Sequence, residues 1–215
     1  MTTRVLRILI AAFAATILVA CGGDSGPSPD IHDSKYAAIG LSGEPADIDD
    51  GQWPCVLDQY SGLVWEVKTE APGLHHWQHT YSWYDPDESH DQGLDYRGVA
   101  NGGICTDSDC DTYSYAQAVN EAGYCGYRDW RIPARDELAS ISDLRKIKTP
   151  PTINSRYFPF TQLEEYWSGN DYSFQWDSAW TWNFRFGHDR VDWKKTPKLV
   201  RLVRGEAVML ERVDD

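Results

Sequence analysis

The sequence predicts one α+β domain in an exported protein. Three observations support this class: short apolar runs with the twofold alternation of strands, two segments with helical spacing, and an even number of cysteines from position 55 onward. The chain has 215 residues, of which 41% are hydrophobic and 13% aromatic, which is enough to fill a core. Its net charge of −13 argues against nucleic-acid binding, because phosphate groups need cationic partners.

The first twenty residues have the features of a bacterial export signal. Arg4 and Arg7 precede an apolar run, residues 8–20, that is short for a bilayer span and ends in Leu-Val-Ala directly before Cys21. This arrangement resembles a lipoprotein signal, so we expect cleavage before Cys21 and attachment to a membrane through acyl chains on it. Because Gly22 rather than Asp follows, the outer membrane is the expected location. An ordinary signal peptide with an incidental cysteine is the alternative.

Composition divides the rest of the chain into three parts. Residues 21–51 are rich in Gly, Ser, Pro and Asp, which indicates a flexible tether between the lipid and the fold. The folded domain is expected at residues 52–205, and residues 206–215 are expected to form a tail.

The domain should open with a β-hairpin followed by a long loop. Apolar residues 56–57 and 63–65 flank a turn that contains Gly62, a pattern typical of a hairpin. Residues 68–101 then contain many His, Asp, Tyr and Trp with little periodicity, and we expect a large loop there. Long ordered loops often carry function.

A first helix is predicted at residues 113–122. Asp111 or Thr112 is suited to cap its start, and Gly123 is suited to end it. The face expected to be buried contains Tyr115, Val119 and Ala122.

A second helix should follow Pro133, because apolar residues then recur at a spacing of three, and it must end before Pro150. The recurring residues are Leu138, Ile141 and Leu144.

Two later strands complete the predicted elements. In residues 179–186 aromatic side chains alternate with polar ones, which predicts a strand with four aromatic rings on one face. The other strand is predicted at residues 199–204. The four aromatic residues are Trp180, Trp182, Phe184 and Phe186.

Four cysteines remain for the folded domain, and three pairings are possible. The helix between Cys110 and Cys125 holds its ends about 15 Å apart, whereas bridged Cα atoms lie within about 7 Å. We therefore favour Cys105 with Cys110 and Cys55 with Cys125. A zinc site is the alternative, but the sequence has no Cys-x-x-Cys pair and the expected compartment is oxidising.

Short motifs follow one another in order across residues 52–205, among them Cys55-Val56-Leu57-Asp58, Asp129-Trp130-Arg131-Ile132-Pro133, Tyr166-Trp167-Ser168 and Val203-Arg204-Gly205. In this order they resemble the Lcl C-terminal domain family, a bacterial family named after the C-terminal domain of a collagen-like adhesin. The resemblance implies the C-type-lectin-like fold of formylglycine-generating enzymes, a small mixed sheet with two short helices and long ordered loops. It implies no activity, because most members have none assigned.

Two features of this sequence differ from related proteins. Ala134 stands where the family commonly has Thr or Asn, and it cannot cap the second helix, which forgoes about 1 kcal/mol. The formylglycine-generating enzymes use reactive thiols late in the domain, and this chain has no cysteine after Cys125. Their activity is therefore not expected here.

Aromatic residues among charged neighbours are the candidate ligand contacts. We expect their rings to remain exposed and to stack on a glycan or on an envelope protein, beside the basic stretch of residues 185–204. The cations of that stretch are expected to face the acidic first half or water, and a surface for anionic glycans is the alternative. The candidate contacts are Trp77, Trp83, Tyr84, Trp193 and Arg190.

Other positions within these motifs are better explained as scaffold. Trp65, Trp130 and Trp167 lie in the motifs and are expected to fill the core, and Arg131 is expected to pair with a carboxylate such as Glu137 or Glu66.

Metal sites and catalysis are only weakly indicated. Asp107 and Asp109 alternate like the start of a calcium loop but lack its glycine and its final glutamate. His76 and His79 lie in a His- and Asp-rich stretch that also includes His90, without a His-Glu-x-x-His motif. We expect no cofactor, with calcium as the one ion left open.

The sequence thus predicts a lipid-anchored envelope protein whose single domain binds or adheres without catalysis. A structural envelope protein with no soluble ligand is the first alternative. A carbohydrate-active or metal-dependent enzyme is the second, because paired carboxylates are easily placed in so acidic a chain.

Overall fold

The computed structural model describes residues 35–51, 53–87 and 96–206. The expected signal sequence and lipidation site at Cys21 lie outside these residues, as does the expected tail from residue 207 onward. Within the described part of the chain, no helix is long and apolar enough to cross a membrane.

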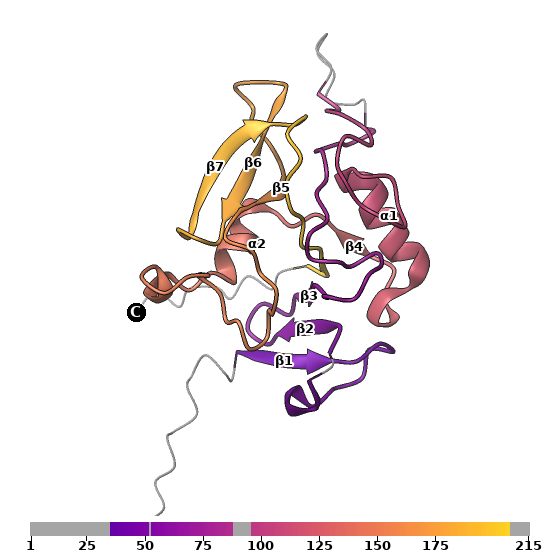
Figure 1. Ribbon diagram of the computed structural model, residues 1–215, viewed down its shortest axis with the longest axis vertical. Helices are drawn as coiled ribbons and strands as arrows, with labels where there is room; N and C mark the ends of the chain where they lie inside the picture. The colour runs from indigo at the N-terminus through magenta and orange to yellow at the C-terminus, as the bar shows by residue number, and fades with distance from the viewer. Residues whose placement is uncertain (1–34, 52, 88–95, 207–215) are drawn as a thin grey trace, which may run out of the picture.

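The fold is α+β, as predicted, and contains two antiparallel sheets (Figure 1). The larger sheet has the strand order β1-β2-β3-β8-β4, and its neighbouring strands are all antiparallel. These strands are β1 (Tyr36–Ile39), β2 (Cys55–Asp58), β3 (Val64–Glu66), β8 (Val203–Arg204) and β4 (Trp130–Arg131).

The predicted hairpin is formed by β2 and β3. Val56 lies opposite Trp65, and the turn contains Gly62 at a φ of 76°, a conformation that favours glycine. The Gly62 N–H donates to the Asp58 carbonyl at 2.8 Å and closes the turn.

The smaller sheet has the order β5-β6-β7 and lies at the other end of the molecule from β1 (Figure 1). Its strands are β5 (Glu165–Asp171), β6 (Ser178–Asn183) and β7 (His188–Trp193). The predicted strand 179–186 is therefore too long, because the Asn183 side chain accepts the backbone N–H groups of Arg185 and Phe186 and turns the chain. As a result Phe184 is buried, whereas Phe186 is exposed.

Helix α1 (Thr112–Ala122) forms where the sequence predicted it. The Asp111 side chain accepts the Ser114 N–H at 2.8 Å, and Gly123 ends the helix in the left-handed conformation. Tyr115 and Val119 are buried as expected, but Ala122 is exposed and Ala116 takes its place in the core.

Helix α2 (Arg135–Ser140) is shorter than predicted. Leu138 and Ile141 are buried, whereas Leu144 lies exposed in a separate 3₁₀ turn. At the start of the helix the Glu137 carboxylate accepts the Ala134 N–H at 2.7 Å, so that one backbone donor is satisfied without a capping side chain at Ala134. The 3₁₀ turns of the fold are η1 (Ile48–Asp50), η3 (Tyr124–Gly126) and η4 (Leu144–Lys146).

The fold begins earlier than residue 52. Strand β1 pairs with β2, and its Tyr36 and Ile39 side chains are buried in the core. Residues 35–51 therefore belong to the domain rather than to the tether. The Gly- and Ser-rich composition of this region hid a strand of only four residues.

Two disulfides stabilise this architecture, and they join the cysteine pairs that the sequence favours. Cys55 of β2 is bonded to Cys125 of η3, with Cα atoms 6.5 Å apart, and Cys105 is bonded to Cys110. Trp65, Trp130 and Trp167 are buried, as predicted for core residues.

Candidate ligand-binding site

The long segment after β3 is ordered where the structure describes it. Single β-bridges attach it to distant parts of the chain: Thr80 pairs with Ile104, and Tyr81 pairs with Lys198. The approach to Thr80 is possible because residue 103 is glycine; a Cβ there would lie 2.1 Å from the Thr80 carbonyl oxygen. These bridges place residues 77–80 beside residues 197–199.

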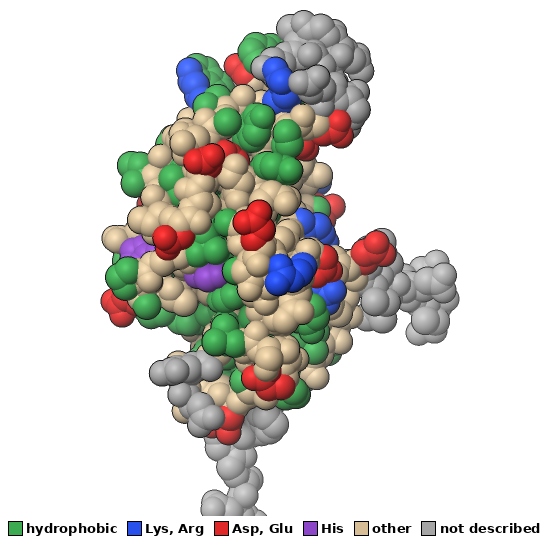
Figure 2. Space-filling view, turned by 90° about the vertical axis from the view of Figure 1, so that its right-hand side faces the viewer, with side chains coloured by type: hydrophobic (Ala, Val, Ile, Leu, Met, Phe, Trp, Pro, Cys, Tyr) green, Lys and Arg blue, Asp and Glu red, His purple; other side chains and the backbone are tan. Residues whose placement is uncertain are grey.

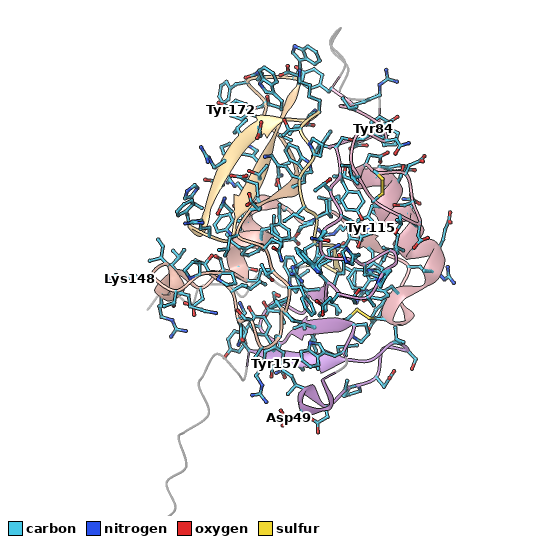
Figure 3. The ribbon with its side chains drawn as sticks, viewed as in Figure 1. Asp49, Tyr84, Tyr115, Lys148, Tyr157 and Tyr172 are labelled. Atoms are coloured by element: carbon cyan, nitrogen blue, oxygen red, sulfur yellow. A yellow bond between two sulfur atoms is a disulfide. The ribbon has the colours of Figure 1, made fainter. Side chains whose placement is uncertain are left out.

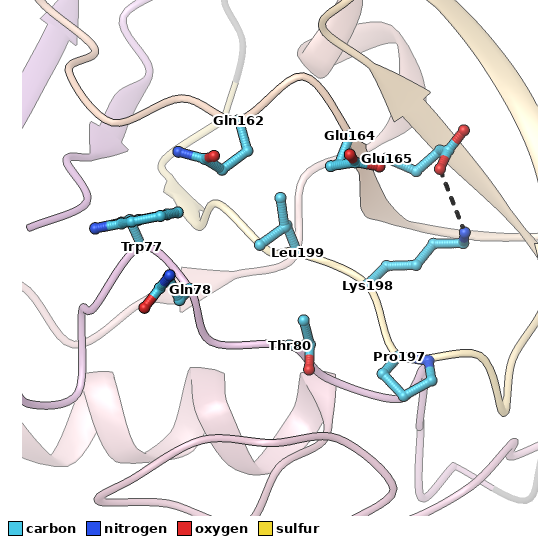
Figure 4. A pocket seen from close by; sticks show the side chains of 9 residues that line it. All are labelled: Trp77, Gln78, Thr80, Gln162, Glu164, Glu165, Pro197, Lys198 and Leu199. Carbon is cyan, nitrogen blue, oxygen red and sulfur yellow. Dashed lines mark ion pairs between the residues drawn. The ribbon is translucent and has the colours of Figure 1, made fainter.

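An open cleft of about 480 Å³ lies where these segments meet the chain that enters β5 (Figure 4). Figure 4 shows Trp77 on one side, Gln162 and Glu164 on the opposite rim, and Leu199 between them. The cleft is lined by Trp77, Gln78, Thr80, Gln162, Glu164, Glu165, Pro197, Lys198 and Leu199.

Charged groups at one end of the cleft form a chain of ion pairs. The Glu165 carboxylate lies 3.5 Å from Arg190 and 3.6 Å from Lys198. Lys198 lies closer to Asp192, at 2.7 Å. Partial burial works to raise the pKa of Asp192, but the hydrogen bonds from Lys198 and from the Trp193 N–H, together with the positive charge of Lys198, outweigh burial and lower that pKa. Glu164 is exposed, and its carboxylate has no ion pair or hydrogen bond within the described residues.

A second group of charges, which we call the Glu66 cluster, is buried behind the segment that carries Trp77. Glu66 is fully buried and accepts hydrogen bonds from Lys68 at 2.9 Å, from His75 at 2.8 Å and from the Leu202 N–H at 2.9 Å. The Tyr115 hydroxyl also donates to it. Burial works to raise the pKa of Glu66, but Lys68, His75 and Tyr115 hold it well below its usual range.

Aromatic rings enclose the Glu66 cluster. Tyr115 of α1, labelled in Figure 3, stacks on Tyr81 with ring centroids 4.5 Å apart, and His75 stacks on Tyr124 at 3.7 Å. Burial, followed by the negative charge of Glu66, raises the pKa of Tyr115 well above its usual value. Since Glu66 is enclosed and fully hydrogen-bonded, the cluster acts as scaffold and presents no free acid or base to solvent.

Arg201 connects the Glu66 cluster to the rim of the cleft. Its buried guanidinium donates to the backbone carbonyl of Glu66 at 2.6 Å and to the Thr161 hydroxyl at 2.9 Å. Thr161 directly precedes Gln162, which lines the cleft. The interior therefore fixes the position of one rim.

The structure brings only two of the five predicted ligand contacts to the cleft. Trp77 forms a wall of it, and Arg190 lies beside it through the ion pair with Glu165. Trp193 is exposed on β7, where Lys195 lies over its ring at 4.5 Å, and it does not line the cleft.

Trp83 and Tyr84 do not form a ligand site either. Trp83 is buried rather than exposed: its indole N–H donates to the Ser168 carbonyl at 2.8 Å, and Lys194 lies 4.1 Å from the ring centroid. Its buried partners, Ser168 and Lys194, lie far along the chain, so the polar residues next to Trp83 in the sequence did not indicate its burial. Tyr84 is half-buried against the start of α1, where its backbone N–H and carbonyl both bond the Thr112 hydroxyl.

Most cations of the basic stretch, residues 185–204, are paired with carboxylates of their own half of the chain. Lys194, Lys198 and Arg201 are buried, and the two lysines pair with Asp171 and Asp192. Arg204 forms an ion pair with Asp129 at 2.7 Å, and Arg190 lies 3.5 Å from Glu165. On the side of the molecule that carries α1, Lys and Arg side chains also lie among Asp and Glu (Figure 2).

The scaffold interpretation of Arg131 is confirmed. Its guanidinium forms two hydrogen bonds of 2.7 Å with the Glu137 carboxylate and a third with the Gly205 carbonyl at 2.8 Å. Arg131 thus ties α2 and the end of β8 to β4, with no donor directed at the cleft.

The weak metal candidates do not assemble in the described part of the chain. Asp107 and Asp109 are exposed, and the rings of His76 and His79 lie 5.4 Å apart. Among the described residues, no three His, Cys, Asp or Glu side chains form a group that would hold a metal ion. His90 lies outside those residues.

Most of the residues that line the cleft were not predicted as ligand contacts from the sequence. Gln162, Glu164 and Glu165 precede and begin β5, and Lys198 lies almost adjacent to Tyr81 only because of a single β-bridge. No periodicity marks such residues. The one usable signal was Trp77, a large aromatic residue in a polar loop.

A comparison with models of protein families matches residues 54–204 to the Lcl C-terminal domain. The chain belongs to the Lcl C-terminal domain family. The match spans the domain from β2 to β8, including both disulfides, the cleft and the Glu66 cluster. Lcl C-terminal domain membership and two disulfides fit a protein of the cell surface or envelope. A comparison with curated proteins gives no match.

Proposed function

We propose that this chain is a lipid-anchored envelope protein whose Lcl C-terminal domain binds a glycan without catalysis. The observation that carries the proposal is the cleft with Trp77 as one wall. An indole face stacks well on the C–H face of a sugar ring, and ligand sites commonly combine such a ring with a few polar groups. Gln78, Thr80 and Gln162 supply amide and hydroxyl groups for the sugar hydroxyls.

The placement of the carboxylates supports binding rather than glycoside hydrolysis. Hydrolysis requires an acid and a second carboxylate on either side of the scissile bond. In the cleft, Glu164 and Glu165 are neighbours in sequence and lie on the same rim (Figure 4). Glu165 is also held in ion pairs with Lys198 and Arg190, which makes it poorly suited to act as a proton donor.

The anchor is the second part of the proposal. Acylation of Cys21 would attach the domain to the outer membrane, and the chain between Cys21 and β1 would give it reach. An intact-mass measurement of the protein expressed in a bacterial host tests this. A mature chain without acyl mass, or a membrane-bound Cys21→Ala variant, would show that the anchor is wrong.

The glycan proposal is tested by a glycan array followed by Trp77→Ala on any ligand found. Loss of one stacking ring should weaken binding by roughly 1 to 2 kcal/mol, which is about 5- to 30-fold in Kd. Trp193→Ala is the matched control, since it removes an exposed indole outside the cleft.

Two results would contradict the proposed function. The first is a Trp77→Ala variant that binds as tightly as the unmodified protein while Trp193→Ala does not. The second is the release of shorter sugars when the purified protein is incubated with its glycan, which would identify an enzyme.

A further inference from the structure

The proposed function leaves the class of glycan open. The charged side chains of the cleft indicate which charge on a sugar would be favoured. Two carboxylates, Glu164 and Glu165, line the cleft against one cation, Lys198. Lys198 lies nearer to Asp192, at 2.7 Å, than to Glu165, at 3.6 Å. Arg190 gives Glu165 a further partner at 3.5 Å. Glu164 therefore remains the charged group of the cleft with no partner among the described residues.

The indole of Trp77 is also left without a cation. Four other tryptophan rings have a Lys or Arg of the domain over them, at 4.1 to 5.6 Å from the ring centroid. No Lys or Arg of the described chain lies over Trp77, whose nearest ring contact is His76. The four rings with a cation are Trp83, Trp167, Trp180 and Trp193.

Resting on the proposed function, we infer that the cleft prefers sugars with a free, protonated amino group. A sugar ring on Trp77 would place an ammonium group where the indole face attracts cations and where Glu164 provides an unpaired carboxylate. Both interactions require the same positive charge on the ligand. N-acetylated sugars lack that charge, and uronic or sulfated sugars bring the opposite one.

A competing charge lies beneath the rim. Arg201 is buried behind Thr161, and its guanidinium has no carboxylate partner among the ion pairs of the described residues. Its field favours anions, but it reaches the cleft from the interior, whereas Glu164 is at the surface where a ligand touches it. The two charges predict opposite preferences, which makes the inference easy to test.

The test compares three oligosaccharides of equal length with the full chain by titration calorimetry near pH 6. They are built from glucosamine, from N-acetylglucosamine and from a uronic acid. We expect the glucosamine oligomer to bind about 5- to 30-fold more tightly than the N-acetylated one, from one exposed cation–π contact and one surface ion pair. The preference should shrink in high salt, because exposed charges are screened.

Glu164→Gln should remove most of this preference and leave the affinity for the N-acetylated oligomer within about twofold. Glu121→Gln is the matched control, because it changes an exposed glutamate on α1 outside the cleft and should leave the preference intact.

The outcomes separate this inference from the proposed function. If the N-acetylated oligomer binds through Trp77 and the amine adds nothing, the inference is wrong and the glycan proposal stands. A preference for the uronic oligomer shows that Arg201 rather than Glu164 governs the cleft, and it overturns the inference. If none of the three oligosaccharides binds, the inference is wrong, and the glycan array decides the proposed function separately.

Discussion

The Glu66 cluster and the cleft contain the same kinds of side chain and differ in how completely they are paired. In the Glu66 cluster, a carboxylate, a lysine, a histidine and tyrosines satisfy one another away from water. In the cleft, Glu164 and the ring of Trp77 have no such partners within the described chain. Residue type therefore does not distinguish scaffold from ligand site in this domain, because the same kinds of side chain are paired in the Glu66 cluster and unpaired in the cleft.

Two tryptophans of one loop show the same contrast. Trp83 has a carbonyl for its N–H and Lys194 over its face, and it is buried. Trp77, six residues earlier, has neither among the described residues and forms a wall of the cleft. The partners of Trp83 come from distant parts of the chain, so charged sequence neighbours do not keep its indole at the surface.

Removal of the central carboxylate should have the largest effect on stability. Glu66→Gln leaves Lys68 buried without its counter-ion, and such a change costs about 3 to 5 kcal/mol in the free energy of unfolding. Chemical denaturation measures it. Glu164→Gln is the control and should change stability by less than about 0.5 kcal/mol, because its side chain is exposed and unpaired. If both variants lost similar, small amounts of unfolding free energy, the contrast between a paired Glu66 cluster and an unpaired cleft would be wrong.

The disulfide in the interior should contribute more to the free energy of unfolding than the disulfide in the loop beside the cleft. Cys55–Cys125 closes 70 residues and holds β2 next to η3, whose Tyr124 stacks on His75; Cys105–Cys110 closes only 5. The chain-entropy model gives about 4 kcal/mol for the first and about 2 kcal/mol for the second. Paired Cys→Ala variants, studied by denaturation, should show this order. A larger loss for the short disulfide would indicate that the loop beside the cleft contributes more to stability than the interior.

Acid should weaken the Glu66 cluster. The pKa of Glu66 is lowered in the fold, so its contribution to stability is complete above its unfolded value, about 4.3, and is lost as the pH falls below it. The stability difference between the unmodified protein and Glu66→Gln should shrink by about 1 kcal/mol between pH 4.3 and 3.3. Urea titrations across this range measure it, and a constant difference would show that Glu66 has an ordinary pKa.

Local signals in the sequence predicted the local structure well. The turn with Gly62, the cap at Asp111 and the stop at Gly123 each follow from one or two residues, and all are present. The disulfide pairing followed from the length of one helix. Strand β1 was missed because four residues in a Gly- and Ser-rich region carry too little pattern to separate a strand from a tether.

The cleft depends on long-range contacts that no local pattern encodes. Its floor exists because the Tyr81 and Lys198 backbones exchange hydrogen bonds of 2.8 and 3.0 Å. Trp77 lines the cleft, whereas Trp83 is buried, and the difference between them is set by Ser168 and Lys194 far along the chain.

The place of β8 in the larger sheet constrains the order in which the fold can be completed. This two-residue strand lies between β3 and β4, yet it follows both of them by a long stretch of chain. While the polypeptide leaves the ribosome, β3 and β4 have no strand between them, so the sheet is incomplete until Val203 and Arg204 emerge. Translation that stops before Val203 would leave two open strand edges, which are sites for aggregation and for recognition by proteases.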